Sequence, residues 1–191
     1  MPEIKDAVAS SSRIMAAVRA IETQRSDRLF EDPLAAQLAL EETIATVAPA
    51  AQEYEDRGTP IVVVRTRFFD DFLTPLAVEL RQVVILGAGM DTRAFRLPWT
   101  TDTHLYELDR AEVLQTKEFL LDNAVAKCHR HPITIDLRQS WADLLVAQGY
   151  QVKTASVWLL EGLLYYMSET QVHELLGTIR SEEHTSELQS L

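Results

Sequence analysis

Hydrophobic and polar residues follow two different rhythms along the chain of 191 residues, and the change falls near residue 80. Before that point, apolar residues recur at the three- and four-residue spacing of helices. The two clearest stripes are Val8, Ile14, Val18 and Ile21, and then Val64, Phe68, Phe69, Phe72, Leu73 and Leu76. We predict two N-terminal helices, a polar separator from Gln52 to Pro60, and a third helix that Pro75 shortens or kinks. Asp32, which precedes Pro33, is predicted to cap a helix.

Beyond residue 82, strand-like and helix-like stretches alternate. Strands are predicted at 83–87, 103–108, 133–136 and 155–161, and helices at 91–97, 110–126, 139–148 and 168–179. Alternation of this kind is typical of a parallel sheet covered by helices. We therefore predict an α/β fold, with residues 1–80 as a helical cap and lead-in helix and residues 81–179 as the domain that carries the sheet.

The last residues do not continue this pattern. From residue 180 the chain reads RSEEHTSELQSL, which resembles the conceptual translation of a widely used short-read sequencing adapter. We interpret 180–191 as an artefactual tail and expect the gene to be cut short after the fourth strand and its helix. The fourth strand then lacks an outer neighbour and invites association. A natural polar tail is the alternative, because chain termini are commonly polar.

Composition restricts the class of partner. Hydrophobic residues make up 47% of the chain and charged residues 25%, which is ordinary for a globular domain. The net charge of −11 argues against nucleic acid and anionic membranes as partners, because both attract Lys and Arg. The longest apolar stretch, Val157 to Met167, contains Glu161 and is far shorter than the roughly 20 residues that span a bilayer. The single cysteine, Cys128, and the lack of a secretory signal at the start predict a cytoplasmic protein.

A glycine pair follows the first predicted strand, in the sequence VVILGAGMDTRAF at residues 83–95. Gly87 and Gly89 allow the backbone to turn sharply where no Cβ atom obstructs a ligand. About 20 residues further on, the second strand ends in YELD, at the spacing of the acid that binds ribose in this fold class. Glu107 and Asp109 point the same way in strand alternation, and Asp109 is the stronger candidate because it lies nearer the strand end. A solvated acid that caps the next helix is the alternative.

The third glycine of the dinucleotide fingerprint is absent, and Met90 lies in that region. That glycine supports close packing beside a pyrophosphate, so its absence favours a ligand without phosphate, such as S-adenosyl-L-methionine. Two further acids fit that ligand, because Asp136 ends the third strand and Glu161 lies within WLLEGLLYY. A carboxylate in such apolar surroundings needs a partner or a cleft, and we expect the cleft, with Gly162 permitting close backbone approach.

Five segments together carry a family resemblance: RTRFFDDFL, VVILGAGMDTRAFRLPW, YELDRAEVLQTK, ITIDLRQSW and WLLEGLLYYMSETQV. From about Ser11 to Ile179 the chain resembles the bacterial branch of the leucine carboxyl methyltransferase family, whose members use S-adenosyl-L-methionine. The resemblance implies a Rossmann-like class I methyltransferase sheet with an N-terminal helical cap. It also implies more chain than is present, namely a fifth parallel strand and an antiparallel pair.

The resemblance also implies roles for single residues. Gly87 and Gly89 wrap the methionine part of the cofactor, and Asp109 holds its ribose. Asp136 and Leu137 lie by the adenine, and Glu161 lies near the amino-acid end. An arginine that precedes the glycine loop grips the cofactor's carboxylate. Both Arg65 and Arg67 fit that role, and the sequence leaves the choice open.

The implied reaction is direct displacement, in which an acceptor oxygen attacks the sulfonium methyl group and catalysis comes mainly from positioning. The acceptor is expected to be a small or carboxylate-bearing molecule. A carboxylate acceptor needs no general base. A hydroxyl acceptor needs one, and the sequence does not identify a residue for that role. Two alternatives stay open: an NAD(P)-dependent oxidoreductase, and an inactive fragment. The segment Cys128-His129-Arg130-His131 suggests metal binding, but we interpret it as a solvated turn before a strand and predict no metal site.

Overall fold

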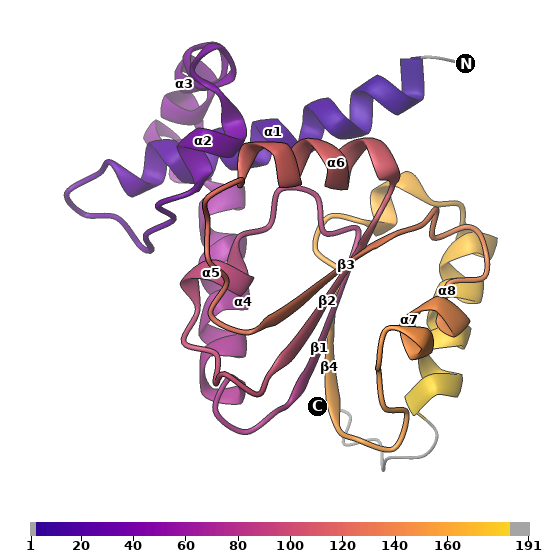
Figure 1. The fold of residues 1–191 in the computed structure, drawn as a ribbon. Coiled ribbons are helices and arrows are strands. Elements are labelled where there is room, and N and C mark those ends of the chain that lie inside the picture. The colour runs from indigo at the N-terminus through magenta and orange to yellow at the C-terminus, as the bar shows by residue number, and fades with distance from the viewer. Residues whose placement is uncertain (1–2, 184–191) are drawn as a thin grey trace.

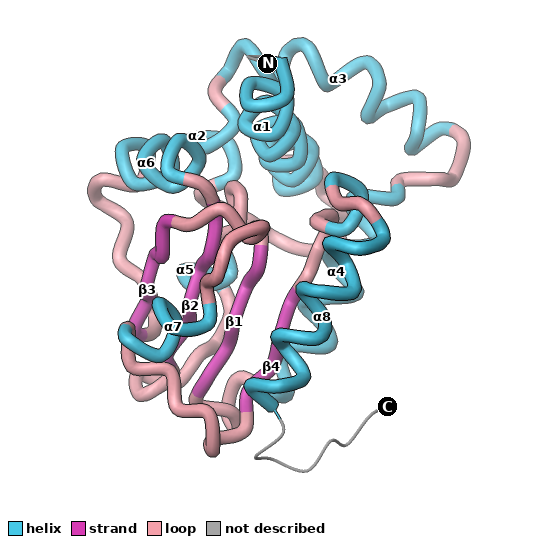
Figure 2. The backbone as a smooth tube through the Cα atoms, turned by 90° about the vertical axis from the view of Figure 1, so that its right-hand side faces the viewer, coloured by secondary structure: helices cyan, strands magenta, loops and turns pink. Residues whose placement is uncertain are grey.

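A four-stranded sheet organises residues 3–183, the part of the chain that the computed structural model describes. The strands are β1 (Gln82–Leu86), β2 (His104–Asp109), β3 (His129–Thr134) and β4 (Ser156–Leu159). They lie in the order β3-β2-β1-β4, and every pairing is parallel (Figure 2). The predicted α/β Rossmann-like class is therefore confirmed. The chain leaves β3 at one edge and returns to β4 beyond β1, so β1 and β4 flank the point where the strand order reverses.

Helices cover both faces of the sheet (Figure 1). The helices α4 (Ile61–Leu76) and α5 (Arg93–Arg96) lie on one face, and α7 (Ala142–Ala147) and α8 (Glu169–Glu183) on the other. All five residues of β1 are buried, as expected for a central parallel strand that is covered on both sides. Successive β1 side chains enter opposite cores, with Val83 and Ile85 in one and Val84 and Leu86 in the other.

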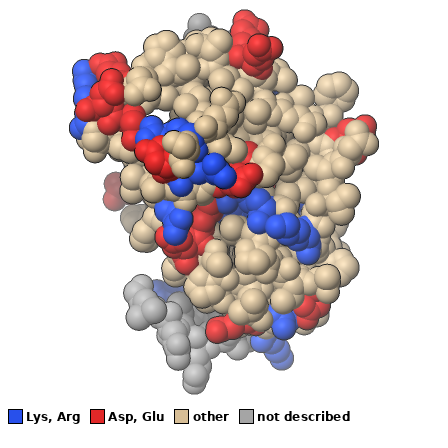
Figure 3. All heavy atoms as spheres, turned by 90° about the vertical axis from the view of Figure 1, so that its left-hand side faces the viewer, with Lys and Arg blue, Asp and Glu red and all other residues tan. Residues whose placement is uncertain are grey.

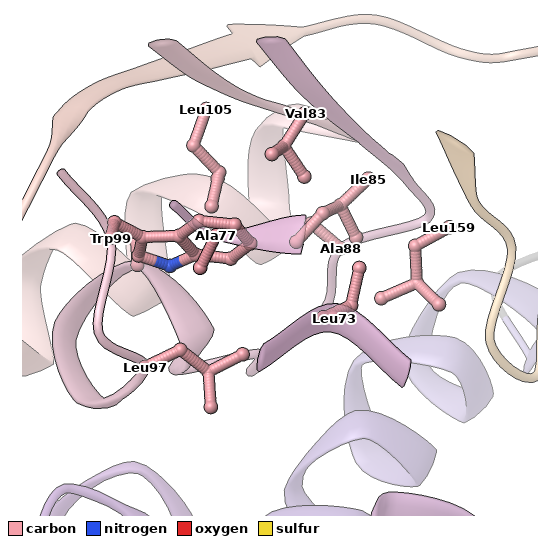
Figure 4. Packing of buried hydrophobic residues seen from close by; sticks show 10 residues of the cluster. Leu73, Ala77, Val83, Ile85, Ala88, Leu97, Trp99, Leu105 and Leu159 are labelled. Carbon is pink, nitrogen blue, oxygen red and sulfur yellow. The ribbon is translucent and has the colours of Figure 1, made fainter. Parts of the chain in front are cut away.

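The core on the α4 face is built around Trp99 (Figure 4). Its ring lies beside Ala77, the residue that follows α4, and Leu105 of β2, and its indole N–H donates a 2.7 Å hydrogen bond to the carbonyl of Arg93. This bond satisfies the one polar atom of a buried ring. It also ties the loop after α5 to the start of that helix, so the core fixes the position of α5.

The N-terminal helices form a separate layer above the strand ends, with α1 (Glu3–Thr23) packed on α2 (Ala35–Ala39) and α3 (Glu41–Asp56) (Figure 1). The predicted stripe on α1 is only partly buried, because Val18 and Ile21 are half-buried and Ile14 is exposed, whereas the buried apolar positions are Ala16, Ala17 and Ala20. Small side chains let the helices approach closely. The helix α6 (Ala111–Leu120) follows β2 and contacts α2 and β3.

Several predicted boundaries need correction. The polar separator begins too early, because α3 continues to Asp56, and the N-terminal region holds three helices before α4 rather than two. The predicted helix 110–126 ends at Leu120. Asp32 is not an ordinary cap, since α2 starts at Ala35 and both Arg19 and Thr92 donate hydrogen bonds to Asp32 Oδ2. The division into a cap and a sheet-bearing domain remains a prediction, and residues 184–191 of the predicted tail lie outside the described residues.

The third strand begins earlier than predicted and overturns the solvated-turn interpretation of its first residues. His129, Arg130 and His131 lie inside β3, paired with His104, Leu105 and Tyr106 of β2. The His104 and His131 rings stack, and His104 Nδ1 lies 3.0 Å from His131 Nε2. Cross-strand ring contacts of this kind stabilise a sheet edge that β-propensity alone does not predict.

Acidic and basic side chains are interleaved on the face shown in Figure 3, where they form a mixed band without a broad basic area. In the described residues, Arg25 forms ion pairs with both Asp27 and Glu55. Among residues 3–183, no helix has both the length and the apolar character needed to cross a lipid bilayer.

Candidate functional site

A cavity of about 460 Å³ opens at the carboxyl ends of β1, β2 and β4, beneath α1. Open α/β sheets bind ligands at this position, next to the reversal of strand order. Seven of the eight predicted site residues line the cavity. They are Arg65, Gly87, Gly89, Asp109, Asp136, Leu137 and Glu161. Arg67 is the exception.

The glycine loop turns as predicted, but the space beside it is used differently. Gly87 and Gly89 have φ angles of +68° and +49°, which side-chain-bearing residues rarely adopt. A Cβ atom on Gly87 would lie 2.9 Å from Leu163 Cδ1, and one on Gly89 would lie 3.1 Å from the Cβ of Ser12. The room that the glycines leave is thus partly filled by the protein itself.

Asp109 joins the second strand to the glycine loop. Its two carboxylate oxygens accept hydrogen bonds of 2.7 Å from the backbone N–H groups of Gly89 and Arg110. Burial raises the pKa of Asp109 above its ordinary value, although these N–H groups act in the opposite direction. Each oxygen keeps a further lone pair, so the carboxylate that shapes the loop can also accept a hydroxyl donor from the cavity.

Of the two acids of β2, Asp109 lines the cavity and Glu107 does not. It is fully buried, and Lys117 Nζ and Arg130 Nη2 contact its Oε2 at 2.7 and 2.8 Å. Glu107 and Asp109 do lie on the same side of β2, as strand alternation predicts. Lys117 of α6 covers Glu107, whereas Asp109 lies just before the first turn of α6 and lines the cavity.

Asp136 and Leu137 lie just after β3, on the cavity wall opposite α4. Arg138 contacts both oxygens of Asp136, with Nε at 2.8 Å from Oδ1. The hydrogen bonds from Arg138 lower the pKa of Asp136 to about 2. Asp136 therefore presents an ionised carboxylate beside an apolar side chain, a combination suited to a heterocycle that carries an amino group.

Glu161 lines the cavity and also has charged partners. The sequence left a cleft and a charged partner as alternatives for this carboxylate, and the structure shows both. Its Oε1 lies 2.9 Å from Arg65 Nε, and its Oε2 lies 2.8 Å from Arg93 Nη1. The guanidinium of Arg65 lies 3.8 Å from the Cβ position of Gly162, so ordinary space remains there. Gly162 is required mainly by its φ of +70°.

Arg67, unlike Arg65, lies outside the cavity lining. Its Nε pairs with Asp71 at 2.8 Å, and half of its side chain is exposed. A helix turns about 100° per residue, so residues 65 and 67 point in nearly opposite directions. Arg65 lies on the same side of α4 as Val62 and Thr66, which also line the cavity, whereas Arg67 lies on the other side of the helix.

A buried charge cluster beside Glu161 escaped the sequence analysis. Arg93 is 2% exposed and contacts Asp70, Asp91 and Glu161. Arg96 adds two hydrogen bonds to Asp70. Burial alone would lower the pKa of Arg93, but the surrounding carboxylates outweigh it and raise that pKa. The segments RTRFFDD and DTRAFR contributed to the family resemblance. Their arginines and aspartates are also the signal that could have predicted this cluster, because Asp70 of the first segment pairs with Arg93 and Arg96 of the second.

The cap supplies the remaining wall. Ser11, Ser12, Met15 and Arg19 line the cavity along one face of α1. Arg19 donates hydrogen bonds to Asp32 at 2.8 Å and to the Met90 carbonyl at 2.5 Å, which ties α1 to the glycine loop. Tyr165 and Tyr166 line the rim as expected for cleft-wall residues, whereas Trp99 and Trp141 are buried in the cores.

No group of three or more histidine, cysteine, aspartate or glutamate side chains within residues 3–183 is arranged to hold a metal ion. The cavity lining, as far as it is described, contains no histidine, lysine or cysteine. Its ionisable groups are arginines, carboxylates and two tyrosines, so polar binding there depends on arginines and acids.

Comparison with known proteins agrees with the resemblance seen in the motifs. The family model described as leucine carboxyl methyltransferase matches residues 12–180. A protein of Frankia alni, named as a candidate S-adenosyl-L-methionine-dependent methyltransferase, is 42% identical over 175 residues, which cover 86% of this chain and 61% of that protein. Similarly named proteins of Streptomyces avermitilis and Streptomyces coelicolor are 40% and 41% identical, over 88% and 86% of this chain.

The chain spans about three fifths of the length of these relatives, 61% of the first and 62% of the other two. The family match nevertheless includes α4, the glycine loop and the segment around Glu161, which together carry the cavity. The chain belongs to the leucine carboxyl methyltransferase family.

Proposed function

We propose that this chain binds S-adenosyl-L-methionine in the cavity and serves a methyl transfer to an oxygen of a carboxylate-bearing acceptor. The observation that carries the proposal is the convergence of Asp109, Asp136 and the Arg65–Glu161 pair on one cavity beside the glycine loop. The family's relatives are named for this cofactor, which supports the same assignment.

The polar groups of the cavity fit an adenosine without phosphates. Asp109 offers lone pairs to ribose hydroxyls, and Asp136 with Leu137 suits the adenine. The loop N–H groups that would hold a pyrophosphate are already used, because Gly87 and Ala88 donate to the Leu108 carbonyl and Gly89 donates to Asp109. The pyrophosphate of a dinucleotide would therefore lie next to the Asp109 carboxylate, where it needs free N–H donors. This disfavours the oxidoreductase alternative.

The amino-acid end of the cofactor fits Arg65. Glu161 engages Nε of this arginine, while Nη2 reaches only the weak acceptor sulfur of Met15, at 3.5 Å. The Nη edge of the guanidinium can therefore take a carboxylate from the cavity, and arginine binds carboxylates well because its donors form a planar fork.

The absence of a free base favours a carboxylate acceptor over a hydroxyl. The described lining carries no histidine or lysine, and Arg93, Arg138 or backbone N–H groups engage its carboxylates. The cofactor supplies an electrophilic methyl group on a sulfonium sulfur. An oxygen of the acceptor carboxylate would form the new carbon–oxygen bond as the carbon–sulfur bond breaks, and the electron pair of the broken bond would remain on sulfur. No proton has to be removed.

The apolar part of the cavity lining is suited to the rest of the acceptor. Its walls come from Met15 of α1, Val62 of α4 and the segment Tyr165–Met167. These side chains are largely apolar, and Tyr165 is 89% exposed at the rim. We therefore expect an acceptor whose carboxylate is joined to an apolar or aromatic group, which would lie against this wall.

Isothermal titration calorimetry on the chain with S-adenosyl-L-methionine and with NAD⁺ tests the cofactor. We expect heat of binding from the first and none from the second. Asp109→Ala should abolish binding, and Arg65→Gln should weaken it strongly. Arg67→Gln is the matched control, because it removes an arginine charge from the same helix outside the cavity. Binding of NAD⁺ alone would reject the proposal.

The acceptor is tested by mass spectrometry of the products formed from matched pairs of aromatic carboxylic acids and phenols. The proposal expects a gain of one methyl group on the acids and none on the phenols. Methylation of the phenols alone would contradict the carboxylate assignment while leaving the cofactor assignment intact.

A further inference from the structure

We propose that Arg93 is a positioning residue for the amino-acid end of the bound cofactor, acting on Arg65 through Glu161. Arg93 is buried and itself lines the cavity, and Glu161 lies between it and Arg65. The inference rests on the proposed function and extends it to a residue outside the cofactor-binding set predicted from the sequence.

The geometry around Arg93 is that of a junction. Its Nε lies 2.8 Å from Asp70 Oδ1 on α4, and its Nη1 contacts Asp91 of the glycine loop and Glu161 after β4. Its own backbone N–H also donates to Asp91 Oδ1 at 2.7 Å. One side chain on α5 thus holds three separate segments of the site together, and the indole of Trp99 anchors the backbone that carries it.

Charge balance explains why the junction needs an arginine. The cluster contains the cations Arg65, Arg93 and Arg96, and the anions Asp70, Asp91 and Glu161. Most of these groups are shielded from water, so an unbalanced charge would be costly. The planar fork of arginine can engage several carboxylates in fixed directions, whereas lysine presents one compact charge on a flexible stem.

Removal of Arg93 is expected to redirect Arg65. At present Glu161 divides its two oxygens between Arg65 and Arg93. Without Arg93, both oxygens are available to Arg65, and a bidentate pair with Glu161 would occupy the donors that face the cavity. The Asp109 and Asp136 end lies on other segments, after β2 and β3, and has its own hydrogen bonds. It should therefore be unaffected.

This difference between the two ends of the ligand makes a sharp test. S-adenosylhomocysteine carries the amino-acid group, and 5′-methylthioadenosine lacks it but keeps the adenosine. By calorimetry on the full chain, Arg93→Gln should weaken S-adenosylhomocysteine binding about tenfold to a hundredfold, the range expected when hydrogen bonds to a charged group are lost. Binding of 5′-methylthioadenosine should change by less than about twofold, since its contacts are separate.

Matched variants isolate the mechanism. Arg67→Gln should change neither affinity, because it removes the same charge from an exposed position. Glu161→Gln should weaken S-adenosylhomocysteine binding by about as much as Arg93→Gln does. The double variant, Arg93→Gln with Glu161→Gln, should lose no more affinity than the weaker-binding single variant, because both changes act through the contact between Arg93 and Glu161. Arg93→Lys should recover part of the loss.

Circular dichroism establishes whether each variant folds. If Arg93→Gln does not fold, Arg93→Lys and Asp91→Asn decide, because Asp91 contacts Arg93 and its removal disturbs the junction more mildly. Equal loss of both ligands in the folded variants, or no loss of either, would overturn the positioning role. A wild-type chain that binds neither compound would instead reject the proposed function, so the two failures are distinguishable.

Discussion

Ser12 of α1 lies directly against Gly89, at a distance where a Cβ atom on the glycine would stand 3.1 Å from the Ser12 Cβ. The close contact joins the cap to the loop that follows β1. The glycine at this position is therefore required twice, once by its φ of +49° and once by the helix above it. The lack of a side chain at position 89 therefore leaves room for α1 as well as for a ligand.

Gly89→Ala should destabilise the fold by about 1–3 kcal/mol, because it adds left-handed strain to a crowded contact. It should also weaken cofactor binding, since Gly89 N–H is bonded to Asp109. Urea unfolding measures the first effect and calorimetry the second. Gly58→Ala is the matched control, with a φ of +66° and nothing within 4 Å of the new Cβ. Equal losses for both variants would show that the contact with Ser12 adds nothing.

Glu107→Gln should lower the free energy of unfolding by about 3–5 kcal/mol, because it leaves Lys117 as a buried cation without its anion and removes one of the two carboxylates that contact Arg130. Glu118→Gln is the control, since Glu118 also contacts Arg130 but is exposed. It should cost less than about 1 kcal/mol. Urea unfolding compares the two variants. A small effect of Glu107→Gln would mean that water enters the interior beside α6.

Acid should weaken the fold through Asp91. Burial alone would raise its pKa, but the charges of Arg93, Lys117 and Arg96 outweigh burial and hold that pKa at about 2. The folded state therefore binds the proton less readily than the unfolded chain. The stabilisation, about 2 kcal/mol, is complete above a pH of about 4 and is lost as the pH falls toward 2. In urea unfolding between pH 5 and pH 2.5, Asp91→Asn should show a shallower pH dependence than the wild type.

The comparison for that experiment is Asp71→Asn, which removes an exposed carboxylate from α4. It should follow the wild-type pH dependence closely. If both variants flatten the curve equally, the acid response does not come from the junction at Arg93.

The exposed side of α4 should drive association of the chain. Ile61, Val64, Phe68 and Phe72 lie along one stripe of the helix, and each is more than half exposed. In the described residues, the outer edge of β4 is also unpaired. Contiguous apolar patches of this kind favour contacts between molecules.

Phe68→Glu combined with Phe72→Lys should reduce concentration-dependent association in light scattering, because the new charges replace the patch and form an i,i+4 pair. The free energy of unfolding should change by less than about 0.5 kcal/mol. Phe119→Gln, at an exposed position on α6, is the control and should leave association unchanged. Unaltered association in the double variant would contradict a role for α4.

The sheet and its ligand edge were predictable because the relevant signals are local. The glycines after β1, the acid that ends β2 and the acid after β4 each stand at the end of an apolar run. Parallel strands bring such ends together, so Gly87, Asp109 and Glu161 could be assigned to one cavity in advance. The choice between Arg65 and Arg67 needed the folded chain, because the cavity side of α4, with Val62, Arg65 and Thr66, is not centred on the buried face of that helix.

Other features depend on contacts between distant segments, which no local pattern reveals. His129 and Arg130 have low strand propensity, and pairing with β2 makes them part of β3. Ala16 and Ala17 look like generic helix formers, yet they form the buried face of α1. The partners of Arg93 lie 23 residues before it, on α4, and far beyond it, after β4. Only the folded chain brings these charges together.

The attachment of α1 has a kinetic consequence. Arg19 binds both Asp32 and the Met90 carbonyl, and the same helix forms one wall of the cavity. A ligand that leaves on this side can do so only after α1 moves away from the glycine loop, which breaks the hydrogen bonds of Arg19 to Asp32 and to the Met90 carbonyl. The residence time of a ligand would then be set by the rate at which the N-terminal layer opens, so two ligands of very different affinity could depart at similar speeds.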